Sequence, residues 1–102
     1  MTKPMIVQEV KEKIRRRLPE LREKYGVSSL KIFGSFVHGS QNQRSDVDLL
    51  VEFEENRPLT LLQFIALERE IGVLVGRKVD LVERKTLKPS IGRRVLAEAE
   101  AV

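Results

Sequence analysis

The segment Asp46–Phe53 constrains the fold most, because apolar and polar residues alternate along it with the period of a β-strand. Val47 and Leu49 fall on one face of this strand, whereas Asp46 and Asp48 fall on the other. A strand with one apolar face needs a second layer to cover that face. The sequence therefore predicts a sheet with helices packed against it.

Helical and strand patterns occupy the chain on both sides of this strand. Apolar residues spaced three and four apart predict two N-terminal helices, the second with Pro19 in its first turn and Gly26 at its end. Thr60 and Gln63 have the spacing of a capping box, which predicts a helix up to Gly76. The expected elements are, in order, a helix from 5 to about 17, a shorter helix to 25, a strand over 27–33, a short helical segment to 39, a polar loop over 39–45, a strand over 46–53, a helix over 61–75, a strand over 78–82 and a helix from 89. This order predicts an α+β (α/β-like) fold, in which a small mixed sheet is flanked by helices.

Length and composition narrow the classes of function. With 102 residues, 41% of them hydrophobic and 33% charged, the chain fits one folded domain over 1–102. No apolar run approaches the roughly 20 residues of a membrane span, and the N-terminal segment lacks the apolar stretch of a secretory signal, which indicates a cytoplasmic protein. The chain has no cysteine and one histidine, which excludes cysteine nucleophiles and thiolate zinc sites. Any metal ion is therefore expected to bind through oxygen.

Charge is distributed unevenly along a chain whose net charge is +4. Residues 32–56 hold five acidic residues and one basic residue, whereas residues 1–31 hold nine basic and four acidic residues. A nucleic-acid backbone would be repelled by this acidic segment, and four Phe and one Tyr give no stacking platform. Clustered carboxylates are, however, what a site for a divalent cation requires. The pattern favours a metal site over a basic nucleic-acid binder.

Three aspartates are the candidate metal ligands. Asp46 and Asp48 project from the same face of one strand, and Asp80 lies in the next predicted strand. If these strands are neighbours, the three carboxylates meet at one site suited to one or two magnesium ions. The alternatives are that Asp46 only begins a strand and that Asp48 and Asp80 face water.

Gly34-Ser35 is the candidate phosphate-binding element, at the sharp end of the strand over 27–33. Glycine lets a phosphate approach the backbone closely, and the Ser35 hydroxyl adds a hydrogen-bond donor. Taken alone, the pair also fits an ordinary tight turn.

In combination, these motifs resemble the minimal nucleotidyltransferases of the DNA polymerase β superfamily. The match runs from Gly34-Ser35 across ten residues to the DVDLLV segment at 46–51, and then through a helix to the GRKVDLV segment at 76–82. It covers residues 26–102 as a catalytic core, with residues 1–25 as N-terminal helices. The resemblance implies a polymerase β-like fold in which Gly34 and Ser35 contact the nucleotide phosphates. It also implies that Asp46 and Asp48 hold metal ions, and that Asp80 helps to bind a metal and prepares the acceptor hydroxyl.

The same resemblance implies a reaction and a partner. The expected reaction transfers AMP from ATP to a hydroxyl. It uses Mg²⁺, with two ions expected, and Mn²⁺ is the alternative metal. Minimal nucleotidyltransferases of this kind resemble antitoxins that attach AMP to a tyrosine of a HEPN-domain toxin, which implies a hetero-oligomer. The alternatives are an antitoxin that neutralises its partner by binding alone and a nucleotidyltransferase that acts on a small molecule.

Two further features bear on this interpretation. Many relatives have Gly-Ser-x-Ala-Arg-Gly where this chain has Gly-Ser-Phe-Val-His-Gly, so His38 replaces the usual arginine. A structural role for His38 is favoured over contact with phosphate or proton transfer. The basic run Arg15–Arg17 is an exposed helix face or a docking surface for the partner, and Arg77 and Lys78 occupy a solvated turn or contact phosphate.

Overall fold

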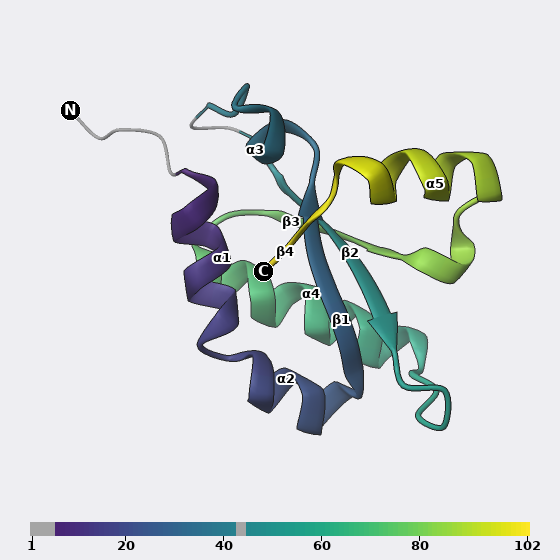
Figure 1. Ribbon diagram of the computed structural model, residues 1–102. Helices are drawn as coiled ribbons and strands as arrows, with labels where there is room; N and C mark the ends of the chain where they lie inside the picture. Colours follow the sequence, from purple (N-terminus) through teal and green to yellow (C-terminus); the bar gives the residue numbers. More distant parts are fainter. Residues whose placement is uncertain (1–5, 43–44) are drawn as a thin grey trace.

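The computed structural model describes residues 6–42 and 45–102 and contains a mixed four-stranded sheet with the strand order β3-β2-β1-β4 (Figure 1). The strands are β1 (Val27–Phe33), β2 (Val47–Phe53), β3 (Val79–Glu83) and β4 (Glu100–Ala101). β1 pairs antiparallel with β2 and β4, whereas β2 pairs parallel with β3. The predicted neighbours at 46–53 and 78–82 are therefore confirmed, and the expected α+β class with a mixed sheet is correct.

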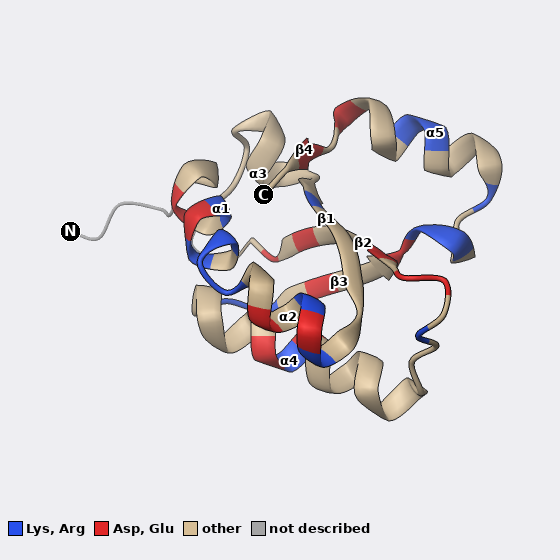
Figure 2. Cartoon of the chain, turned by 60° about the horizontal axis from the view of Figure 1, so that its bottom comes forward, with Lys and Arg blue, Asp and Glu red and all other residues tan. Residues whose placement is uncertain are grey.

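Helices cover one face of this sheet as a layer. They are α1 (Val7–Arg15), α2 (Leu18–Tyr25) and α4 (Leu61–Val75), and their buried side chains share one core with Ile32, Leu49 and Leu81 of the strands. α5 (Pro89–Glu98) lies on the other side of the sheet, connected to β3 by the 3-10 helix η1 (Arg84–Thr86) (Figures 1 and 2). The short helix α3 (Ser35–His38) follows β1 directly.

Helix boundaries follow the local signals in the sequence. Pro19 lies in the first turn of α2, and Gly26 ends that helix in the left-handed conformation with φ 73°. At the start of α4, Gln63 N–H donates to Thr60 Oγ1 at 3.2 Å, and Thr60 N–H donates to Gln63 Oε1 at 2.9 Å. This reciprocal pair is the predicted capping box.

The structure also differs from the expected elements in several places. α1 ends at Arg15 rather than near Arg17, and the predicted strands begin one residue later, at Val47 and Val79. β4 and η1 were not predicted, because two or three residues carry no measurable periodicity. β4 exists because Lys31 and Ile32 of β1 offer an edge, on which Ala101 and Glu100 pair.

Some of the expectations concern residues 1–5 and 43–44, which lie outside the described residues. They are the start of the first helical pattern at Met5, the N-terminal end of the segment that lacks a secretory signal, and two residues of the polar loop over 39–45. No helix within 6–42 or 45–102 is long and apolar enough to cross a membrane.

Candidate active site

The parallel pairing of β2 and β3 places two of the predicted aspartates side by side. Asp48 is the register partner of Asp80, and Asp46 lies two residues before Asp48. Because Val47 and Leu49 are fully buried on the helix-covered face, the intervening Asp48 projects from the opposite face. Asp46 and Asp48 are partly buried, whereas Asp80 is exposed. Figure 2 shows acidic residues on β2 and β3 and basic residues on η1 and α5.

The electrostatic environment of Asp48 reflects this gathering of like charges. Burial raises the pKa of its carboxyl above the ordinary value of 3.8, and the negative charges of Asp80 and then Asp46 raise it further. A cation placed between these carboxylates would relieve the repulsion. The charges of Asp46 and Asp80 thus act on Asp48 through space.

Gly34 brings the predicted phosphate-binding turn against the same carboxylate. Its backbone has φ 78° and ψ −148°, a conformation open essentially only to glycine. A Cβ atom added to Gly34 would lie 2.3 Å from Asp48 Oδ2 and 3.1 Å from its Cγ. α3 begins at the next residue, Ser35, and two of its amides, those of Val37 and His38, donate to Gly34 O at 3.1 and 3.2 Å. The Gly34-Ser35 turn and the aspartates therefore form one site.

The donor set suits a hard cation, although its ligands are not drawn together around a point. Carboxylate oxygens are the ligands that Mg²⁺ and Mn²⁺ prefer. Among the side chains of residues 6–42 and 45–102, no three acidic or histidine groups stand close enough to hold a metal ion. Asp46, Asp48 and Asp80 fit such an ion in chemical type, and they lie on two adjacent strands with Asp48 and Asp80 in register.

Three basic residues near the site have other contacts. His38 Nε2 lies 3.2 Å from Glu98 Oε2 of α5, which supports the structural interpretation of this replacement for arginine. Lys78 Nζ lies 4.0 Å from Asp46 Oδ2 on a side chain that is 80% exposed. Arg77 donates to backbone carbonyls of the segment before β2. The turn expected at Arg77 is present, but its side chain is partly buried rather than solvated, and no sequence signal marks an arginine that binds carbonyl groups.

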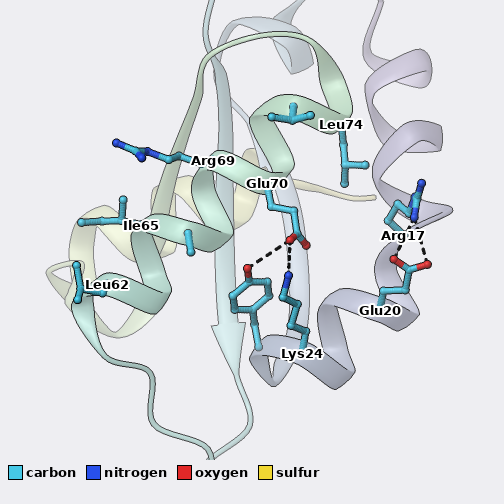
Figure 3. A pocket seen from close by; sticks show the side chains of 11 residues that line it. Arg17, Glu20, Lys24, Leu62, Ile65, Arg69, Glu70 and Leu74 are labelled. Atoms are coloured by element: carbon cyan, nitrogen blue, oxygen red, sulfur yellow. Dashed lines mark hydrogen bonds and ion pairs between the residues drawn. The ribbon is translucent and has the colours of Figure 1, made fainter.

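A groove of about 920 Å³ lies between α2 and α4, away from this site (Figure 3). Its lining includes the exposed apolar side chains of Leu62 and Val73 and the charged side chains of Arg17 and Glu70. None of the predicted site residues contributes to it. The groove belongs to the helix layer, on the face of the sheet opposite Asp48.

Comparison with known proteins agrees with the geometry of the site. The family model described as "Nucleotidyltransferase domain" matches residues 11–102. The chain belongs to the nucleotidyltransferase family. Its sequence is 42% identical over 94 residues to the protein adenylyltransferase MntA of Thermococcus cleftensis, covering 92% of this chain and 93% of that relative. The resemblance inferred from the motifs is therefore confirmed. Membership of this family and similarity to MntA identify the chain as an enzyme.

Two solved structures share the fold of this nucleotidyltransferase. One, provisionally identified as a minimal nucleotidyltransferase, matches with a TM-score of 0.78 and 34% identity, covering 96% of this chain and 97% of that chain. The other is a complex of a tri-AMPylated HEPN toxin with an MNT antitoxin from Shewanella oneidensis. It matches with a TM-score of 0.65 and 19% identity, covering 92% of this chain and 69% of that chain. The second match concerns the fold alone.

We expect Gly34→Ala to disrupt the site far more than Gly39→Ala. Both glycines have positive φ, so both substitutions strain the backbone by about 1 kcal/mol or more. Only at Gly34 does the new Cβ also collide with Asp48, because nothing lies within 4 Å of a Cβ at Gly39. Chemical denaturation should show a larger loss of unfolding free energy for Gly34→Ala, and calorimetry should show loss of nucleotide binding. Equal losses for the two variants would contradict the close approach.

We expect Asp48→Asn to stabilise the protein free of metal at neutral pH. The folded-state pKa of Asp48 is raised, so its protonated form is favoured by folding. The contribution to stability is complete below the unfolded pKa and is lost as pH rises through the raised folded pKa. Urea denaturation in a chelating buffer should therefore show a gain for Asp48→Asn at pH 7.5 that shrinks toward pH 3.5. Glu55→Gln, an exposed loss of one negative charge, is the control, and a variant less stable than wild type at pH 7.5 would refute the expectation.

Proposed function

We propose that this nucleotidyltransferase is a protein adenylyltransferase that moves AMP from ATP to a tyrosine hydroxyl of a HEPN-domain toxin and thereby acts as its antitoxin. The observation that carries the proposal is the contact of the Gly34 backbone with the Asp48 carboxylate beside Asp80. This contact joins a turn suited to phosphate with carboxylates suited to divalent cations. The relative from Thermococcus cleftensis, a protein adenylyltransferase, supports the same activity.

The proposed roles follow from the position of each residue. Gly34, which has no Cβ, lets its turn lie directly against the Asp48 carboxylate, and the Ser35 hydroxyl at that turn would donate to a phosphate. Asp46, Asp48 and Asp80 would hold Mg²⁺ or Mn²⁺, which, when bound, neutralises charge on the triphosphate and eases ionisation of the acceptor hydroxyl. The acceptor oxygen forms a bond to the α-phosphorus, the bond from that phosphorus to the α,β-bridging oxygen breaks, and pyrophosphate leaves. Asp80 is exposed, so it is accessible to the acceptor hydroxyl and would take the proton that this hydroxyl loses.

A second function, neutralisation by binding alone, is favoured by the groove between α2 and α4. Leu62 is 79% exposed and Val73 is 83% exposed on the outer side of α4, which is unusual for large apolar side chains. The charged pairs Arg17–Glu20 and Lys24–Glu70 lie at the same groove (Figure 3). Arg69 also lines it and has no acidic partner among the described residues. We propose that the HEPN-domain partner covers this groove with an apolar surface that carries a carboxylate opposite Arg69.

Transfer and binding can be separated by one experiment. We expect incubation with ATP, Mg²⁺ and the HEPN-domain protein to add the mass of AMP to that protein, as read by intact mass spectrometry. Asp48→Asn should lower the transfer rate by about 100-fold or more, because a carboxylate that holds the metal is lost. Glu55→Gln should transfer at the wild-type rate. Stable association without any added mass from the wild-type enzyme would favour the binding function over catalysis.

Docking should depend on the groove and not on the opposite side of the sheet. Within the basic run Arg15–Arg17, Arg15 Nε donates to Val102 O at 2.8 Å and Arg16 pairs with Glu12, whereas Arg17 lines the groove and is the suitable site for charge reversal. We expect Arg17→Glu combined with Val73→Asp to abolish co-purification of the HEPN-domain protein while leaving nucleotide binding unchanged. Arg93→Glu on α5 is the control and should co-purify normally. Loss of nucleotide binding with association preserved would place Arg17 at the triphosphate and refute the docking assignment.

A further inference from the structure

Arg77 contacts both segments that carry the active site. It follows Gly76, which ends α4 in the left-handed conformation, and its own N–H donates to Gly72 O at 3.2 Å. This turn at the end of α4 leads directly into β3, the strand of Asp80. The Arg77 side chain is partly buried rather than extended into solvent.

Two carbonyl groups before β2 accept hydrogen bonds from the Arg77 guanidinium. Its Nη1 atom lies 3.2 Å from Asn42 O and 3.1 Å from Ser45 O. The same two residues are also joined to each other, since Ser45 N–H donates to Asn42 O at 3.1 Å and Asn42 N–H donates to Ser45 Oγ at 2.9 Å. Ser45 directly precedes Asp46. Arg77 therefore restrains the backbone from which the first aspartate projects.

The guanidinium also lies against α3. The Arg77 Cζ atom is 5.4 Å from the centroid of the Phe36 ring, within the range of a cation–π contact. Phe36 is 1% exposed and directly follows Ser35, so its ring is anchored in the core beside the Gly34-Ser35 turn. One side chain thus connects the turn on α3 with the segment that delivers Asp46.

We propose that Arg77 is a positioning residue that holds the Gly34-Ser35 turn and the aspartates at the separation that nucleotide binding needs. The proposal rests on the nucleotidyl transfer proposed above. Separation matters because Gly34 approaches Asp48 so closely that even a Cβ would not fit. A planar guanidinium can donate to carbonyls while its face rests on a ring, whereas a lysine ammonium cannot do both. Direct contact with phosphate, the rival role for Arg77, would also be weakened by lysine, but that change would leave the backbone of these segments unaltered when no nucleotide is bound.

The first test measures the dissociation constant of the non-hydrolysable analogue AMP-PNP with Mg²⁺ by calorimetry. We expect Arg77→Lys to weaken binding about tenfold or more, because small misplacements of binding groups are costly. Arg22→Lys, a matched change on the exposed side of α2, should leave the dissociation constant unchanged. Phe36→Leu should weaken binding as well. The double variant with Arg77→Lys should raise the dissociation constant by less than the product of the two single fold-changes. Wild-type affinity in Arg77→Lys would overturn the proposal.

The second test measures amide hydrogen exchange without nucleotide. We expect Arg77→Lys to speed exchange at the amides of Val37, His38 and Ser45, while amides in the middle of α4 exchange as in wild type. A uniform acceleration across the protein would indicate a general loss of stability and would overturn the positioning role. If the wild-type protein does not bind AMP-PNP with Mg²⁺, the proposed function fails, and the local exchange still decides whether Arg77 restrains these segments.

Discussion

The parallel pairing of β2 and β3 is the interaction on which the site depends. It sets Asp48 beside Asp80, an arrangement that like charges oppose; burial raises the pKa of Asp48, and the charge of Asp80 raises it further. The pairing persists because the opposite face of the same strands is covered by α1, α2 and α4, and Val47 and Leu49 there are fully buried. Burial on one face therefore stabilises an unfavourable grouping of charges on the other, which a cation can relieve.

Local sequence patterns predicted the helices and strands well. Features that depend on contacts between residues far apart in the sequence could not be predicted. The period-2 alternation around Asp48 predicted which face of the sheet this residue occupies, and the Thr60 capping box predicted the start of α4. Each prediction depends on residues only a few positions apart. The need for glycine at position 34 arises from Asp48, which is distant in sequence, and could be predicted only as a turn. Arg77 donates to backbone carbonyls, which every residue has. These contacts therefore could not be predicted from the sequence.

The replacement of the usual arginine by His38 has a structural context. His38 ends α3 and pairs with Glu98 near the end of α5, across 60 residues of sequence. α5 itself carries Arg93 and Arg94, and it lies on the side of the sheet from which Asp48 projects (Figure 2). The pair thus links the Gly34-Ser35 turn to a helix with two arginines, so α5 adds positive charge on this side of the sheet without an arginine at position 38.

The two proposed surfaces lie on opposite sides of the sheet, and this separation constrains how a partner delivers its hydroxyl. The groove with Val73 belongs to the helix layer, whereas Asp48 and Asp80 face away from that layer. A partner seated on the groove cannot present a residue from its docked surface to the aspartates. The proposed acceptor tyrosine would then have to come from a separate segment that reaches around the sheet, or from a second partner molecule in a larger assembly. In either case docking raises the effective concentration of the hydroxyl without shaping the catalytic site, so affinity for the partner and the rate of transfer are set by different residues.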